Sequence, residues 1–170
     1  MKLFGALSIL LGSLLAALSV LREDGRRLRL LRELRQALRL LRIELDEQQT
    51  ALPAAFRRLA ERMGSGAAGG FFTALAQSME RLGEESFSAL WRAAVSEKLA
   101  ALEAEDRDKL ASLGDLLGGS ELAFQCAALE KCASDFESRA AQCAAQAAQR
   151  RRMTLTLALS LGGFVVIILL

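Results

Sequence analysis

Two uncharged apolar stretches stand near the ends of the chain, on either side of a long segment in which apolar and charged residues alternate at helical spacings. The first stretch, residues 3–21, has nineteen residues between Lys2 and Arg22, and the second, residues 153–170, has eighteen. At 1.5 Å per residue, helices of these lengths reach ~28 and ~27 Å, close to the ~30 Å of a bilayer's hydrocarbon core. The pattern predicts transmembrane helices over residues 1–21 and 153–170, with a helical domain over residues 22–152 between them.

The placement of arginines argues for a membrane span, against a secretory signal peptide, in the first stretch. The apolar run is longer than the ~7–15 residues of a signal-peptide core, although Ala17 and Ser19 weakly imitate a cleavage site. Arginines follow the first stretch from Arg22 onward, and three more precede the second at residues 150–152. Positively charged residues beside membrane spans stay on the cytosolic side. We therefore expect a protein of the cell membrane whose central domain lies in the cytosol and whose two termini lie outside.

Residues 120–170 are predicted to form one helix that leads from the domain into the second apolar stretch. Ser120 is placed to cap its start, and neither Gly nor Pro interrupts it before Gly162. Apolar residues recur along it at alternating spacings of four and three, which is typical of a single apolar face. This C-terminal stripe packs inside its own bundle or joins copies of the chain. It consists of Leu122, Cys126, Leu129, Ala133, Phe136, Ala140, Cys143 and Ala147.

Residues 26–49 predict a second strongly amphipathic helix with two neighbouring stripes. Its apolar stripe is Leu31, Leu34, Leu38, Leu41 and Leu45. Beside it runs an arginine stripe, rotated by about 100° and formed by Arg32, Arg35, Arg39 and Arg42. These arginines either cover the edge of the core and pair with Glu33 or Glu44, or bind an acidic partner surface or anionic headgroups.

Four shorter helices are expected between these two, which gives an all-α bundle of about six helices. A break at residues 50–53, with Pro53 in the first helical turn, precedes a short helix to Met63. Residues 64–70, with four glycines in seven residues, are interpreted as a loop that serves as a linker. Further helices follow from Phe71, from about Ser86, and from the acidic residues 103–108. Trp91, the only Trp of the chain, is predicted to anchor the core.

The residue types present argue against most catalytic chemistry. The chain has no His, which excludes Ser-His and Cys-His pairs and HExxH zinc sites within it. Its three cysteines lack CxxC spacing and are interpreted as reduced structural thiols. Residues 103–108 lack the regular oxygen spacing of a calcium loop, and no motif indicates nucleic-acid binding. We therefore expect no enzyme activity, no metal and no cofactor.

Charge is distributed unevenly although the net charge is only +2. Residues 22–62 hold eleven basic and seven acidic side chains, whereas residues 80–137 hold six basic and thirteen acidic ones. The basic and acidic halves either complement each other when packed or attract an external partner.

The order of these features resembles the stage III sporulation protein AB family over nearly the whole chain. The matching pieces are the first apolar span, the Leu-Arg run of residues 31–45, the restart at residues 50–53 and the Phe71-Phe72 pair. They continue with Leu110, Leu113-Gly114, Leu117-Gly118, Gln125 and the final helix. The Gly-rich loop, the three cysteines and Ser120-Glu121, where an Asp is usual, depart from the family pattern.

This resemblance implies an assembly role in endospore formation. Members belong to the channel complex between mother cell and forespore, and their helical domain is similar to cytosolic domains of type II secretion and type IV pilus platform proteins. It implies a non-enzymatic platform in the mother-cell membrane that couples a secretion-type ATPase to the other membrane components. The alternative is a membrane-anchored scaffold that forms homo-oligomers through the C-terminal stripe, with Gly162-Gly163 allowing close approach in the membrane.

Overall fold

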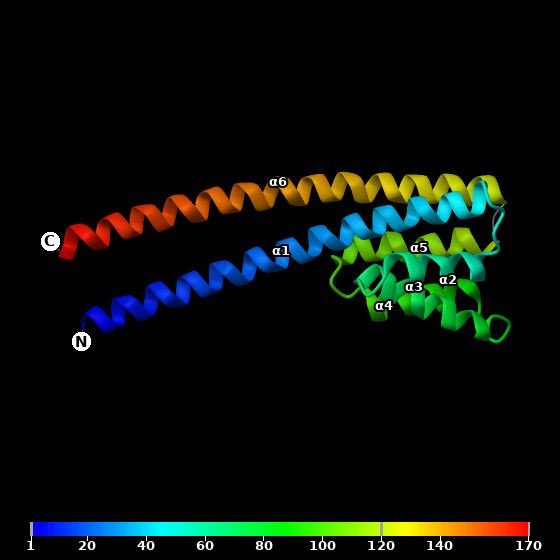
Figure 1. Ribbon diagram of the computed structural model, residues 1–170, viewed down its shortest axis with the longest axis horizontal. Helices are drawn as coiled ribbons and strands as arrows, with labels where there is room; N and C mark the ends of the chain where they lie inside the picture. The colour runs from blue at the N-terminus through cyan, green and yellow to red at the C-terminus, as the bar shows by residue number, and fades with distance from the viewer. Residues whose placement is uncertain (1, 120, 170) are drawn as a thin grey trace. The chain divides into compact units, whose positions relative to one another are not determined.

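The computed structural model describes the backbone of residues 2–119 and 121–169, and the side chains of residues 22, 25–119, 121–154, 156 and 157. This part of the chain contains six α-helices, one short 3-10 helix and no strand (Figure 1). They are α1 (Lys2–Asp46), α2 (Leu52–Met63), α3 (Ala67–Ser78), η1 (Met79–Arg81), α4 (Phe87–Lys98), α5 (Ala104–Gly119) and α6 (Leu122–Leu169). The prediction of an all-α protein with six helices is confirmed.

The chain divides into two compact units. One consists of Met1–Leu28 and Ala141–Leu170, and the other of Arg29–Ala140. The second unit, called the bundle below, contains the C-terminal part of α1, helices α2 to α5 and the N-terminal part of α6.

The two predicted transmembrane helices are not supported by the structure. Within the described residues, no helical stretch is both long enough and apolar enough to cross a bilayer. Residues 1–21 and most of residues 153–170 lie outside the part of the chain whose side chains the structure describes. Ser120, the predicted cap of the last helix, also lies outside the described residues, and α6 begins at Leu122.

Helix α1 is longer than the pattern predicted. Residues 1–21 and 26–49 were expected to form two separate helices. The structure has one helix, Lys2–Asp46, that passes through Gly25. A glycine costs a helix about 1 kcal/mol relative to Ala without breaking it, and no Pro occurs in this stretch. The helix ends in a turn in which Gln49 has a φ of 48° and the Thr50 amide donates to the Glu44 carbonyl at 2.9 Å.

The core of the bundle follows the predicted apolar stripe of α1. Its five leucines are buried, with exposed fractions of 4% or less: Leu31, Leu34, Leu38, Leu41 and Leu45. Aromatic side chains from α2, α3 and α4 form a second part of this core around Trp91, which is fully buried as predicted. The ring centroid of Phe71 lies 5.1 Å from that of Trp91 in an edge-to-face arrangement, and that of Phe56 lies 6.1 Å away.

The interpretation of residues 64–70 as a loop was wrong for residues 67–70. Residues 67–70 form the first turn of α3, and Gly69 is buried. A Cβ atom built on Gly69 would lie 1.9 Å from the carbonyl oxygen of Gly64, so only glycine permits this approach between the end of α2 and the start of α3. The glycines set the packing of a tight helical hairpin.

Candidate interaction surface

Three arginines of the predicted arginine stripe pair with acidic residues of α6. Arg35 donates from Nη1 to Oε1 of Glu137 at 2.7 Å, and Arg39 donates from Nη2 to Oε2 of the same carboxylate at 2.8 Å. Arg42 pairs at 3.4 Å with Glu130 of α6 and with Asp46 of its own helix. One carboxylate therefore joins two turns of α1 to α6 within the bundle.

The expected partners of the arginine stripe were Glu33 and Glu44, and that expectation was wrong. Spacing along one helix indicated them, whereas the partners on α6 lie 88 to 102 residues away in sequence, and the one partner within α1 is Asp46, four residues after Arg42. The paired arginine side chains remain 34% to 44% exposed, so each ion pair contributes at most about 1 kcal/mol. Arg32 is exposed and makes no ion pair with any described residue. The basic and acidic halves of the chain thus complement each other here, and Arg32 keeps its charge facing solvent.

Glu44 is a buried carboxylate that fixes the start of α2 against the end of α1. Its side chain is 5% exposed, and its Oε2 accepts from Arg58 Nη1 at 2.7 Å and from the Thr50 hydroxyl at 3.3 Å. Arg58 also donates to Oε1 of Gln48 at 2.7 Å. A buried carboxylate requires such partners, because removing it from water costs several kcal/mol. The turn at residues 47–51 is held by this network.

Asp106 is a second buried carboxylate, and it connects α5 to α6. It is 1% exposed and lies 3.2 Å from Nε of Arg139, which also pairs with Glu105. Glu105 further accepts from Lys109 at 2.9 Å, and the hydrogen bonds from Lys109 and then Arg139 hold the pKa of Glu105 below its ordinary value. Arg139 in turn has a raised pKa because Glu105 accepts its hydrogen bond and Asp106 lies nearby.

Sequence reasoning missed both buried carboxylates, although each interrupts an apolar stripe. Glu44 stands three residues after Leu41, and Asp106 stands four before Leu110, on the buried faces of their helices. An acidic residue at an apolar position of a helical pattern signals a buried pair, but it does not identify the partner.

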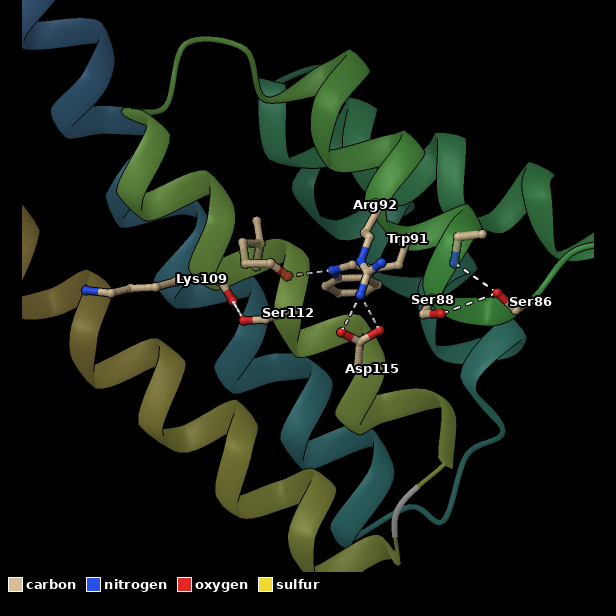
Figure 2. Close-up of polar contacts among 9 residues, drawn as sticks. Ser86, Ser88, Trp91, Arg92, Lys109, Ser112 and Asp115 are labelled. Atoms are coloured by element: carbon tan, nitrogen blue, oxygen red, sulfur yellow. Dashed lines mark hydrogen bonds and ion pairs between the residues drawn. The ribbon is translucent and has the colours of Figure 1, made fainter.

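Helices α4 and α5 are joined through Trp91 and its neighbour (Figure 2). The indole Nε1 of Trp91 donates to the carbonyl of Leu110 at 2.6 Å, and Arg92 donates to both carboxylate oxygens of Asp115 at 2.8 and 2.5 Å. The Trp91 indole lies against Gly114 of α5, where a Cβ atom would come within 2.6 Å of the ring. The hydrogen bond and the glycine together place the indole flat against α5.

Most of the C-terminal stripe is buried within the chain. Cys126, Leu129, Ala133, Phe136, Ala140 and Cys143 are at most 9% exposed. At the two ends of the stripe, Leu122 is 42% exposed and Ala147 is half-buried. The stripe thus already has packing partners within the single chain.

Nothing in the described part of the chain resembles a metal centre, since it contains no group of three or more His, Cys, Asp or Glu side chains placed to hold an ion. The cysteines are free thiols. Burial, followed by the nearby Asp135 carboxylate, raises the pKa of Cys132 to about 12, and burial also raises the pKa of Cys126. Thiols with raised pKa values are poor nucleophiles and poor metal ligands at neutral pH.

The family model described as stage III sporulation protein AB matches residues 2–170 of this chain. The chain belongs to the stage III sporulation protein AB family. A solved structure titled "Stage III sporulation protein AB" is similar in fold, with a TM-score of 0.65 and 21% sequence identity over 72% of this chain and 97% of that one. No curated protein matches the sequence. Membership identifies a sporulation-related protein of a family known for structural components.

Many of the residues that carry the family resemblance lie in the core of the bundle. Phe71 and Phe72 are fully buried, and Gly114 lies against Trp91. Gln125 of α6 donates to the carbonyl of Leu117 near the end of α5 at 2.9 Å, which ties two successive helices together. These residues of the resemblance therefore contribute to how the helices pack.

Proposed function

We propose that this protein is a non-enzymatic platform of the channel complex between mother cell and forespore, where it couples a secretion-type ATPase to the membrane assembly. The family match over residues 2–170 carries this proposal. In support, α6 continues as one helix from Leu122 to Leu169 through Arg150, Arg151 and Arg152. A partner bound to the bundle would act on residues 153–169 through this continuous helix.

The arginine stripe is the first surface we propose for the ATPase. Arg32 has no ion pair among the described side chains. Arg35, Arg39 and Arg42 are 34% to 44% exposed but are paired with Glu137, Glu130 and Asp46. An acidic partner surface would gain charge-assisted hydrogen bonds there, most readily at Arg32 because no internal pair has to be broken.

The test is capture of the ATPase of the complex by the full-length chain from membranes of sporulating cells. We expect Arg32→Glu to weaken capture at least tenfold, and Arg57→Glu, an exposed arginine of α2, to leave it unchanged as a matched control. The exchange of Arg42→Glu with Glu130→Arg tests contact separately from packing, because it keeps an ion pair between α1 and α6 while it changes the charge of the stripe, and we expect it to weaken capture as well. Equal capture by all these variants would rule out the arginine stripe as the contact.

Membrane anchoring through residues 1–21 and 153–170 remains part of the proposal. The clusters of arginine that follow the first stretch and precede the second support a cytosolic bundle. We expect the chain to stay with membranes in alkaline carbonate and to require detergent for release. Release by carbonate alone would contradict the two spans, and it would leave the arginine-stripe proposal in place.

The scaffold alternative, with homo-oligomers formed through the C-terminal stripe, is less compatible with the packing. Six of its eight residues are buried in the single chain, so joining two copies there would require α6 to leave its own bundle. No observation on the described residues favours this second function.

A further inference from the structure

The bundle exposes large apolar side chains at one of its ends. Among the described residues, six large hydrophobic side chains are strongly exposed, and four of them belong to chain connections or the helix turns beside them: Leu82 at 50%, Leu116 at 48%, Leu122 at 42% and Phe124 at 65%. Leu82 follows η1, Leu116 lies in the last turn of α5, and the other two lie in the first turn of α6. These side chains belong to two connections, η1–α4 and α5–α6, and exposed apolar patches are typical of interaction sites.

Three connections meet at this end, as contacts between their flanking residues show. Gln125 of α6 bonds to the Leu117 carbonyl of α5. A Cβ atom on Gly118 of α5 would lie 3.1 Å from Phe87, which follows the connection between η1 and α4. Arg42, one turn before the end of α1, pairs with Glu130 of α6. In Figure 1 the α1–α2, η1–α4 and α5–α6 connections lie at the same end of the bundle.

The charge around these apolar side chains is strongly negative. Residues 46–51, 79–86 and 115–124 contain seven carboxylates and one cation, Arg81. All seven are exposed: Asp46, Glu47, Glu80, Glu84, Glu85, Asp115 and Glu121. Arg42, Arg81 and Arg92 neutralise three of them, namely Asp46, Glu85 and Asp115. The remaining four, Glu47, Glu80, Glu84 and Glu121, have no ion pair among the described residues.

We propose that this acidic end, defined by Leu82, Leu116, Leu122, Phe124 and the four unpaired carboxylates, is a docking surface for a protein segment that carries apolar side chains flanked by Lys or Arg. Anionic lipids and nucleic acids are repelled by the carboxylates, whereas a basic amphipathic helix satisfies both charge and apolar contact. This surface is separate from the arginine stripe, and the proposal does not depend on the ATPase being its partner.

The first test measures binding of a fluorescent helical peptide, with leucines on one face and lysines beside them, to the full-length chain in detergent by anisotropy. We expect saturable binding that weakens at least tenfold in Phe124→Ser with Leu122→Ser, and likewise in Glu84→Lys with Glu121→Lys. Asp108→Lys, an exposed carboxylate in the first turns of α5, is the matched control and should bind as wild type does. A peptide with Glu in place of Lys should not bind.

Lack of saturable binding by the wild-type chain would overturn the proposal, and so would equal binding by all variants. Because the substituted side chains are exposed, the fluorescence of buried Trp91 should be unchanged in every variant and serves as the check on folding. A photo-crosslinking residue in place of Phe124, introduced in sporulating cells, provides the second test. The crosslinked peptide, identified by mass spectrometry, should contain Lys or Arg next to apolar residues. A neutral or acidic peptide, or an arginine segment of a second copy, would contradict a separate partner protein.

Discussion

Replacement of Gly114 by Ala tests how tightly α5 packs against Trp91. A Cβ atom at this position would lie 2.6 Å from Cδ1 and Cγ of the indole and 2.9 Å from its Cβ. Carbon atoms prefer separations of about 3.5–4.0 Å, so either the helix or the ring must move by roughly 1 Å. The ring is held by its hydrogen bond to Leu110 at 2.6 Å and by Phe71 at a centroid distance of 5.1 Å.

Overpacking of this kind costs about 1–3 kcal/mol, while Ala in place of Gly gains about 1 kcal/mol of helix propensity. Gly70→Ala is the matched control, because Gly70 is also helical and a Cβ there meets nothing within 4 Å. The propensity gain is common to both variants and cancels in their comparison. We therefore expect Gly114→Ala to be less stable than Gly70→Ala by about 2 kcal/mol, which is the steric cost alone.

The measurement is urea unfolding of the full-length chain, followed by circular dichroism and by the emission of Trp91, the only Trp. The free energy of unfolding should decrease with urea concentration at the same slope in both variants. Only Gly114→Ala should shift the emission of the native protein, since its new methyl group displaces the indole. If the two variants prove equally stable, α5 and the indole separate at little cost, and the reasoning from the 2.6 Å approach fails.

Two further predictions concern titratable groups. The hydrogen bond from Lys109 lowers the pKa of Glu105 below its ordinary value of 4.5, so the stabilisation from this carboxylate is present above about pH 4.5 and is lost as the pH falls through the lower folded pKa. The melting temperatures of wild type and Glu105→Gln should therefore differ at neutral pH and converge in acid; a difference that persists in acid would contradict this. Burial raises the pKa of Cys132 to about 12, so iodoacetamide should modify this thiol in urea but scarcely in the folded chain at neutral pH, as measured by mass spectrometry. Rapid modification of the folded chain would show that the thiol is accessible.

Local periodicity predicted the helices of the bundle apart from the start of α3, and it predicted much of what they bury. The leucine stripe of α1, the Phe71-Phe72 pair and Trp91 are buried as expected, because a helix with one apolar face must turn that face inward wherever it packs. The same local reasoning failed where long-range packing sets the outcome. Gly69 lies in the first turn of α3, and the carbonyl of Gly64 approaches it so closely that only glycine fits there, which no spacing rule within the stretch shows.

Local spacing also failed to predict the ion-pair partners of the arginine stripe. Rules for pairs within a helix proposed Glu33 and Glu44 for its arginines, but Glu137 lies 98 residues beyond Arg39. Glu44 instead is buried and bonded to Arg58 of α2. The packing of the bundle therefore decides which arginines of the stripe are paired, and among the described residues Arg32 has no ion pair.

The sequence by itself determined that this protein is all-α, that its helices carry continuous apolar faces, and that it has the order of features of its family, since these depend on residues close together in the chain. Only the tertiary structure decided which charged residues pair, and that three connections meet at one acidic end. The exposed leucines and Phe124 belong to connections that are more than thirty residues apart in sequence, so only the packing of the helices decides that they lie at the same end of the bundle.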